Sequence, residues 1–317
     1  MLTNGKLQLE KIFRGETPDF PPTFELVFYL HKEMFGMDYD EAMAHAHTDA
    51  ARIDASEAFH REVALRCVDE FGYAAVTMPH YGATFDLFPA IKKLKRELDG
   101  RALIMGKNGD SVIWMPVGGD AYYEFALDLY EAPEKLHALA KQKVATAKEY
   151  TLRQIDAGVD FIMQNTDFGL NTGPFISPAQ FAEFCAPYMA EIIAYQHEQG
   201  LPVIMHSDGN LNSILDQIHA TGVDGYQSID PQGMMDIAEV RRLYPDWILM
   251  GNVNCAMLQE VQEEQIRESV RYCMTHGGMG KRYIFSTSNC IYPSMPPESY
   301  HIMLDEYERC VQLRVKS

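Results

Sequence analysis

Three side chains with metal-binding chemistry follow apolar runs in the second half of the chain. His206 comes directly after the run 202–205, and Asp208 stands two residues later in the sequence HSDGN. On extended backbone such residues project to the same side, so both can bind one ion. Cys290 follows the last apolar run and is able to complete a three-ligand Zn²⁺ set that leaves one position open for substrate, although residue types and spacing alone leave a metal site and a structural role equally open. For His206 and Asp208 alone, a hydrogen-bonded turn at Asp208-Gly209 is an equally good interpretation.

Other polar residues also stand at or near the ends of apolar runs. Glu25 lies inside the run 22–30, where a buried carboxylate needs an ion pair, a proton or a metal, and we carry it as a catalytic candidate. Asp167 begins a Gly-rich loop and is a candidate general acid or base, with a loop-stabilising carboxylate as the alternative. Cys255 is a rival thiol to Cys290. The expected substrate contacts are His80, Asn165, Gln227, Asn252 and Cys255.

The elements that position these residues repeat as a short apolar run followed by a helical pattern. Such repeats predict βα units and a parallel sheet. An eighth run lies within 101–119, and the phrase GVD at 158–160 and 222–224 predicts two equivalent turns from helix to strand. The other expected strands are 22–30, 73–78, 160–166, 202–207, 224–229, 247–253 and 282–288.

Eight βα units predict a (β/α)₈ TIM barrel, and the absence of linkers or low-complexity tracts predicts a single domain over 1–317. Long helices are expected over 40–72 and 177–200, the second with a Ser177 cap and a proline in its first turn. A doubly wound open sheet is the alternative. No GxGxxG or P-loop follows any strand, so the barrel is preferred. Barrel enzymes carry their chemistry at the carboxyl ends of the strands, where the candidate residues stand.

The composition and net charge of the chain limit the kinds of molecule that it is expected to bind. The chain has 317 residues, 47% of them hydrophobic, and a formal net charge of −18. That charge disfavours nucleic acid and anionic membrane surfaces, which both require a basic footprint. The scattered cysteines, with no apolar leader and no membrane-length apolar run, predict reduced thiols and a cytoplasmic location.

The sequence resembles the uroporphyrinogen decarboxylase superfamily over most of its length, above all at 167–188, 201–246 and 251–254. The resemblance implies a (β/α)₈ barrel. The decarboxylase branch carries an Arg-rich N-terminal segment and an acid after its second strand. Here 14–26 has Arg14 alone and 76–85 has no acid. Uroporphyrinogen decarboxylation is therefore not the favoured activity.

The methyltransferase branch of that superfamily carries a His-x-Cys motif and a distant second Cys as zinc ligands. His206 and Cys290 match this motif, whereas Asp208 stands in place of the first Cys. A carboxylate in place of a thiolate makes the ion a harder Lewis acid, which suits an ether oxygen better than a thiol. The ligand set implied is His206, Asp208 and Cys290.

The resemblance implies transfer of a methyl group from a methyl ether, such as a methoxylated aromatic, to the Co(I) corrinoid of a partner protein. The first alternative is the reverse-type reaction from methylcobamide to a thiol or folate. The second is a decarboxylating or tetrapyrrole-binding barrel. Because barrel enzymes often dimerise, a homodimer is among the expected assemblies.

Overall fold

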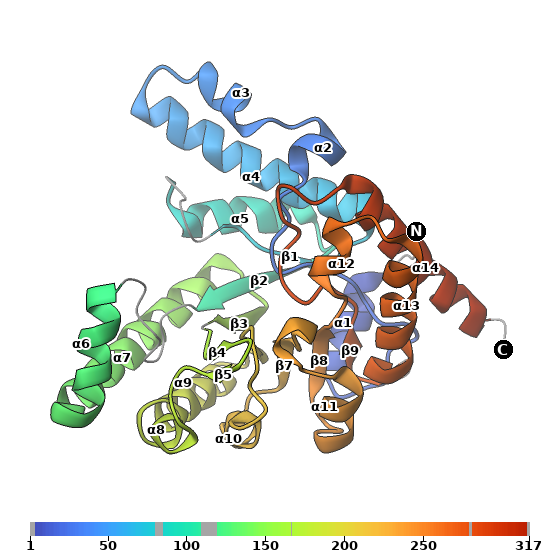
Figure 1. The fold of residues 1–317 in the computed structure, drawn as a ribbon. Coiled ribbons are helices and arrows are strands. Elements are labelled where there is room, and N and C mark those ends of the chain that lie inside the picture. Colours follow the sequence, from blue (N-terminus) through green and yellow to red (C-terminus); the bar gives the residue numbers. More distant parts are fainter. Residues whose placement is uncertain (1–3, 80–84, 109–118, 166, 279–280, 316–317) are drawn as a thin grey trace.

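A curled parallel sheet forms the centre of the molecule (Figure 1). The computed structural model describes residues 4–79, 85–108, 119–165, 167–278 and 281–315. Its seven strands run in the order β1-β2-β3-β6-β7-β8-β9, and every neighbouring pair is parallel. They are β1 Ala75–Val76, β2 Leu103–Asn108, β3 Phe161–Asn165, β6 Val203–His206, β7 Gly225–Ser228, β8 Ile248–Gly251 and β9 Tyr283–Ile284. The predicted α/β class and parallel sheet are thus confirmed, in a TIM-barrel-like arrangement.

The segment 22–30 was expected to be a regular strand and is instead an irregular extended segment between β9 and β1. Thr23 forms a parallel bridge with Phe285, and Phe28 forms one with Ile291. On its other side the carbonyl of Thr23 accepts a hydrogen bond from Ala74 N. Two prolines precede Thr23 and cannot donate to a ladder, which limits regular pairing at this end. The segment 22–30 therefore contacts both edges of the curled sheet, next to β9 on one side and next to β1 on the other.

Helices surround the curled sheet (Figure 1). The predicted helix 40–72 is two helices, because Thr48 caps a new helix after a break. The predicted helix 177–200 also divides, at Cys185, where Pro187 lacks the N–H that would continue the first helix. The described helices are α1 Gly5–Phe13, α2 His31–Phe35, α3 Tyr39–Ala44, α4 Asp49–Phe71, α5 Leu87–Leu98, α6 Gly119–Glu131, α7 Pro133–Ala157, α8 Pro178–Phe184, α9 Ala186–Glu198, α10 Leu215–Ala220, α11 Ile237–Leu243, α12 Cys255–Gln259, α13 Glu263–Cys273 and α14 Pro297–Val315.

Shorter elements complete the chain. A 3₁₀ turn, η1, spans Pro231–Gly233, and a π turn, η2, spans Met274–Gly278. The small strands β4 (Gly169–Leu170) and β5 (Gly173–Pro174) form an antiparallel pair in the loop after β3. Ser177 caps the start of α8 as expected, and the structure adds Gln180, which completes a capping box with it. None of the helices in the described ranges is long and apolar enough to cross a membrane.

The two GVD turns make the same contacts, as their shared sequence predicts. Gly158 ends α7 at φ +99°, and Gly222 follows α10 at φ +85°, a conformation that favours glycine. Asp160 then accepts a hydrogen bond from Ile104 N at 2.7 Å, and Asp224 accepts one from Val203 N at 2.7 Å. Each aspartate thereby fixes the register between its own strand and the preceding one.

The sheet buries side chains on both faces. In β6, Val203 and Met205 pack in one hydrophobic cluster and Ile204 packs in the other. Such two-sided burial is typical of parallel sheets covered by helices. Because side chains alternate along a strand, His206 lies on the same face as Ile204. His206 therefore lies on the face of the sheet opposite to Val203 and Met205.

Candidate active site

Asp167, His206 and Asp208 form a compact group at the carboxyl ends of β3 and β6. One ligand atom from each lies within 4.8 Å of the others. His206 Nε2 is 3.6 Å from Asp167 Oδ1 and 3.9 Å from Asp208 Oδ2. The sequence placed Asp167 at the neighbouring strand end as a catalytic candidate, and the structure puts it beside the predicted ligand pair.

Gln227, at the end of β7, orients the imidazole of His206. The Gln227 amide nitrogen donates to the carbonyl of Thr287 at 3.4 Å, which directs its amide oxygen at His206 Nδ1. An amide oxygen can only accept, so Nδ1 carries a hydrogen, and Nε2 is the ring nitrogen that faces Asp167 and Asp208. A histidine that ligates a metal is commonly oriented by such a second hydrogen bond. Gln227, which the sequence nominated as a substrate contact, contacts the candidate ligand His206 in the structure.

Asp208 is held by three hydrogen bonds. Ser228 Oγ donates to Oδ1 at 2.6 Å, Asn289 Nδ2 donates to Oδ2, and Asp208 N donates to Asp167 Oδ1 at 3.0 Å. Burial raises the pKa of Asp208, opposed by His206 and Ser228 and reinforced by the nearby carboxylates of Asp167 and Asp230. A divalent cation would offset this repulsion. One imidazole nitrogen and two carboxylate oxygens are a donor set that suits Zn²⁺.

Three glycines let the loops beneath this group approach each other closely. A Cβ on Gly233 would lie 2.3 Å from the carbonyl carbon of Gly209, and one on Gly169 would lie 3.1 Å from the carbonyl oxygen of Asp208. Gly209 itself has φ +80°. The loops after β3, β6 and β7 are thus packed backbone to backbone, which fixes Asp208 relative to Asp167.

Cys290 lies outside this group, although the sequence nominated it as the third ligand. It is partly buried, and burial raises its pKa to about 12, opposed by the charge of Lys107 and reinforced by Asp208. Its neighbour Asn289 binds Asp208, while its other neighbour, Ile291, exchanges backbone hydrogen bonds with Val27 and Tyr29. Cys290 therefore lies in the chain between a residue that contacts the candidate metal group and a residue that contacts the wall of a cavity, to which Val27 and Tyr29 belong.

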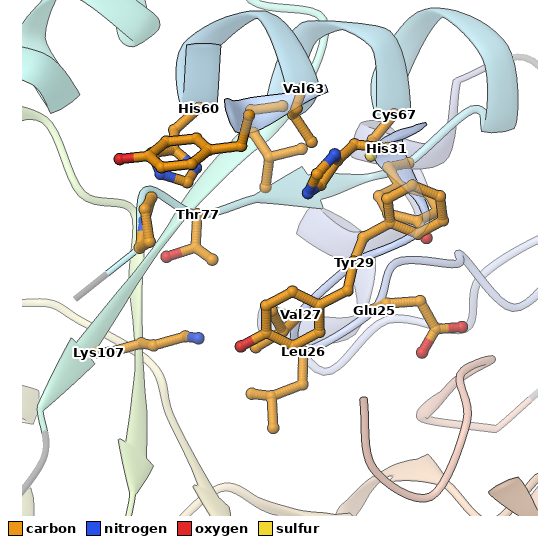
Figure 2. Close-up of a pocket in the computed structure, with 16 residues that line it drawn as sticks. Glu25, Leu26, Val27, Tyr29, His31, His60, Val63, Cys67, Thr77 and Lys107 are labelled. Carbon is orange, nitrogen blue, oxygen red and sulfur yellow. The ribbon is translucent and has the colours of Figure 1, made fainter. Parts of the chain in front are cut away.

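That cavity has a volume of about 340 Å³ and lies between the segment 25–31, α4 and the ends of β1 and β2 (Figure 2). Apolar and aromatic side chains make up most of its wall. Such a pocket with few polar groups is typical of a site for a small molecule. It is lined by Glu25, Leu26, Val27, Phe28, Tyr29, His31, Tyr39, His60, Val63, Ala64, Cys67, Tyr73, Val76, Thr77, Pro79 and Lys107.

Glu25 is a buried carboxyl group with hydroxyl partners. It accepts hydrogen bonds from Ser286 Oγ at 2.9 Å and from Thr287 Oγ1 at 2.6 Å. No ion pair joins it to a cation in the described ranges. Burial raises its pKa to about 7. Of the alternatives weighed from the sequence, the structure therefore favours a group that is partly protonated at neutral pH over one in an ion pair.

Lys107, in β2, was not identified from the sequence. Its side chain is buried at 6% exposure and reaches into the cavity (Figure 2). Among the described residues, its ammonium group has no hydrogen bond or ion pair. Burial lowers its pKa to about 8, opposed by Cys290. A lysine directly after the apolar run 102–106 (ALIMG) was the signal that could have identified it.

The remaining predicted residues have varied surroundings. Asn165 pairs in register with His206, and its buried Oδ1 has no hydrogen-bond partner in the described part of the chain. Asn252 donates to the backbone carbonyls of residues 229 and 235, and so holds a loop together. Cys255 is buried at the start of α12, 3.8 Å from the carbonyl of Cys290. His80 lies outside the described residues.

Comparison with known families identifies the chain at the level of family. A model described as uroporphyrinogen decarboxylase (URO-D) matches residues 41–310. The chain belongs to this family. The URO-D match includes the three members of the candidate metal group, and it agrees with the resemblance seen in the sequence.

Relatives that carry the name uroporphyrinogen decarboxylase are moderately similar to this chain in sequence. The uroporphyrinogen decarboxylase of Thioalkalivibrio sulfidiphilus is 28% identical over 230 residues, which cover 69% of this chain and 63% of that protein. The uroporphyrinogen decarboxylase of Photobacterium profundum is 27% identical over 227 residues, 68% of this chain and 61% of that protein. The matched part thus spans less than two thirds of each relative.

A solved structure shares the fold over nearly the whole chain. A methyltransferase from Methanosarcina mazei superposes with a TM-score of 0.71 at 16% identity, covering 97% of this chain and 99% of that one. At this identity the likeness concerns the fold. A URO-D chain can therefore adopt the same fold as a methyltransferase, and the chemistry must be argued from the site.

Proposed function

We propose that this URO-D family member is a zinc-dependent methyltransferase that moves a methyl group from a methyl ether to the Co(I) corrinoid of a partner protein. The observation that carries the proposal is the group formed by Asp167, His206 and Asp208, together with a mostly apolar cavity whose wall contacts the same loop, 289–291, that binds Asp208. Family members with decarboxylase names and a fold neighbour with a methyltransferase name are both compatible with an enzyme.

His206 and Asp208 would hold the zinc ion, with Asp167 or Cys290 as the third protein ligand. When bound, zinc would supply Lewis-acid stabilisation of the negative charge that develops on the ether oxygen. Gln227 keeps Nε2 of His206 available for this role. Ser228 and Asn289 keep the Asp208 carboxylate oriented, since each donates to one of its oxygens.

The cavity would hold the methyl donor. Its aromatic and aliphatic wall suits a methoxylated aromatic, and its volume of about 340 Å³ accommodates a single substituted ring. The loop at Asn289-Cys290 links this cavity to Asp208, and the proposal requires the ether oxygen of the bound donor to reach past this loop to the metal. Substrate binding in this cavity would exclude water from the ether oxygen.

We further propose that the segment 22–30 completes a single-domain (β/α)₈ barrel whose mouth accepts a corrinoid-bearing protein. The parallel bridges of Thr23 and Phe28 support closure at this segment. In barrel enzymes the loops at the carboxyl ends of the strands carry the site. A partner that delivers cobalt to the methyl carbon would dock on those loops.

Two alternatives remain distinct from this proposal. Transfer from methylcobamide to a thiol or folate uses the same fold, but the carboxylate at position 208 favours an oxygen-containing substrate over a thiol. Uroporphyrinogen decarboxylation is favoured by the names of the relatives. However, the described cavity wall contains one lysine and no arginine, which is a poor match for a tetrapyrrole with many carboxylates.

A three-arm assay with the zinc-reconstituted protein separates these activities. The first arm mixes methoxybenzenes with Co(I) cobalamin and follows methylcobalamin by absorbance. The second mixes methylcobalamin with a thiol, and the third measures CO₂ release from uroporphyrinogen. The proposal expects product in the first arm alone. Product confined to the second or third arm would reject it.

A further inference from the structure

Lys107 is a buried cation to which the described residues offer no hydrogen bond and no ion pair. Only 6% of the residue is exposed, and its ammonium group has no hydrogen bond or ion pair within the described ranges. Burying an unpaired charge is costly, so a charge of this kind usually has a partner or a ligand. Lys107 extends from β2 into the cavity (Figure 2).

Arg241 shows how this chain treats a buried cation that has only a structural role. It is 5% exposed, and its guanidinium donates to the backbone carbonyls of Gly277, Pro245, Trp247 and Arg282. All of these contacts come from the protein itself. Lys107 has a comparable degree of burial and none of these contacts, so a packing role does not account for it.

Among the titratable groups around the cavity, Lys107 carries the principal charge. Glu25 is turned toward Ser286 and Thr287, which donate hydrogen bonds to it. Burial and the neighbouring His31 lower the pKa of His60 to about 4, so its ring is neutral at pH 7. The described wall contains no second lysine and no arginine. The cavity therefore combines a mostly apolar wall with one cationic group, Lys107, and with the carboxyl group of Glu25, which is already hydrogen-bonded to Ser286 and Thr287.

We propose that the cavity binds a single-ring aromatic molecule that carries one carboxylate, and that Lys107 binds this carboxylate. The apolar wall contributed by Val27, Phe28 and Val63 accommodates the ring, and the ammonium group supplies a charge-assisted hydrogen bond. The single charge selects a monoanion over a polyanion. The identification of this ligand as the methyl donor rests on the proposed function. Binding of the ligand to the cavity does not depend on that function.

Binding of para-methoxybenzoate and para-methoxybenzamide to the purified full-length protein, measured by calorimetry at pH 7 without zinc or cobalamin, tests this proposal. The two probes have similar shapes and differ in charge. The wild type is expected to bind the benzoate about tenfold or more tightly than the amide, as loss of one charge-assisted hydrogen bond implies. Equal affinities, or no binding of either probe, would overturn the proposal.

Substitutions of Lys107 test whether its charge causes the preference for the benzoate. Lys107→Met is expected to abolish the preference by weakening benzoate binding, with little effect on the amide, and Lys107→Arg should retain it. Lys92→Met, on the outer helix α5, is the matched control for net charge and should behave as wild type. A preference that survives in Lys107→Met contradicts the assignment. If the preference is confirmed but no methylcobalamin forms, the proposed function fails while the binding site stands.

Discussion

The hydrogen bond between His206 Nδ1 and the amide oxygen of Gln227 connects β6 to β7 and directs Nε2 of the histidine at Asp167 and Asp208. Gln227 is fully buried, and its own orientation is set by the carbonyl of Thr287 in the last strand segment. The geometry of the candidate metal centre therefore depends on three strand ends.

Replacing Gln227 with leucine is expected to weaken zinc binding by about 10- to 100-fold, because the imidazole loses the contact that fixes its orientation and tautomer. Gln227→Glu keeps an acceptor and should be closer to wild type. Competition with a chromogenic chelator measures the affinity. Gln196→Leu, which removes another fully buried glutamine far from the site, controls for general packing effects. Equal losses in both leucine variants would rule out an orienting role for Gln227.

Gly233→Ala is expected to lower the free energy of unfolding by about 1–3 kcal/mol, since the new Cβ would overlap the backbone of Gly209. The same displacement would shift Asp208, so zinc affinity should fall as well. Chemical denaturation and chelator competition measure the two effects. A Cβ on Gly119 would meet no atom of the described residues within 4 Å, so Gly119→Ala should change neither. Normal zinc binding in Gly233→Ala would show that the loop contact does not position the ligand.

Glu25 predicts a pH dependence of stability. Its folded-state pKa is raised from 4.5 to about 7, so the folded protein holds this proton more tightly than the unfolded chain. Protonation of Glu25 therefore contributes on the order of 3 kcal/mol to the free energy of unfolding. This contribution is fully present below about pH 4.5 and is lost as the pH rises toward 7. Glu25→Gln should therefore gain stability relative to wild type between pH 5 and pH 8 in urea titrations. Parallel curves would contradict the raised pKa.

The third ligand can be identified with cobalt. The structure favours Asp167, because its carboxylate is already grouped with His206 and Asp208. Asp167→Asn should then weaken metal binding by about tenfold or more, in line with the loss of a ligand. Cys290→Ser should have a smaller effect, and the Co²⁺ form should lack a sulfur-to-cobalt charge-transfer band. Cys310→Ser, in α14, is the control thiol. Such a band that disappears in Cys290→Ser would restore the ligand set expected from the sequence.

The sequence predicts the central strands well and the closing segments less well. The runs that became β3, β6, β7 and β8 are apolar stretches bounded by glycine or polar residues, and their periodicity reflects local burial on two faces. The segment 22–30 is equally apolar, but its pairing depends on both edges of the curled sheet. Contacts between residues more than two hundred positions apart leave no local signal.

The candidate site, like the fold, could be predicted from the sequence only in part. His206 and Asp208 were predicted together because two-residue spacing on extended backbone fixes their relative direction. Whether Asp167 or Cys290 lies beside them depends on how the loops cross the mouth, which spacing along the chain does not determine. Lys107 was missed because the limits of its strand were uncertain from the sequence, and a lysine is usually exposed.

Formation of methylcobalamin from para-methoxybenzoate and Co(I) cobalamin, compared between zinc-loaded wild type and His206→Ala, tests the central claim most directly. The account predicts that methylcobalamin appears with the wild type, disappears when zinc is removed by a chelator, and returns when zinc is restored. It also predicts that His206→Ala stays inactive under all three conditions. Methyl transfer that is equal in the two proteins, or indifferent to zinc, would contradict a metal-dependent methyltransferase at this site.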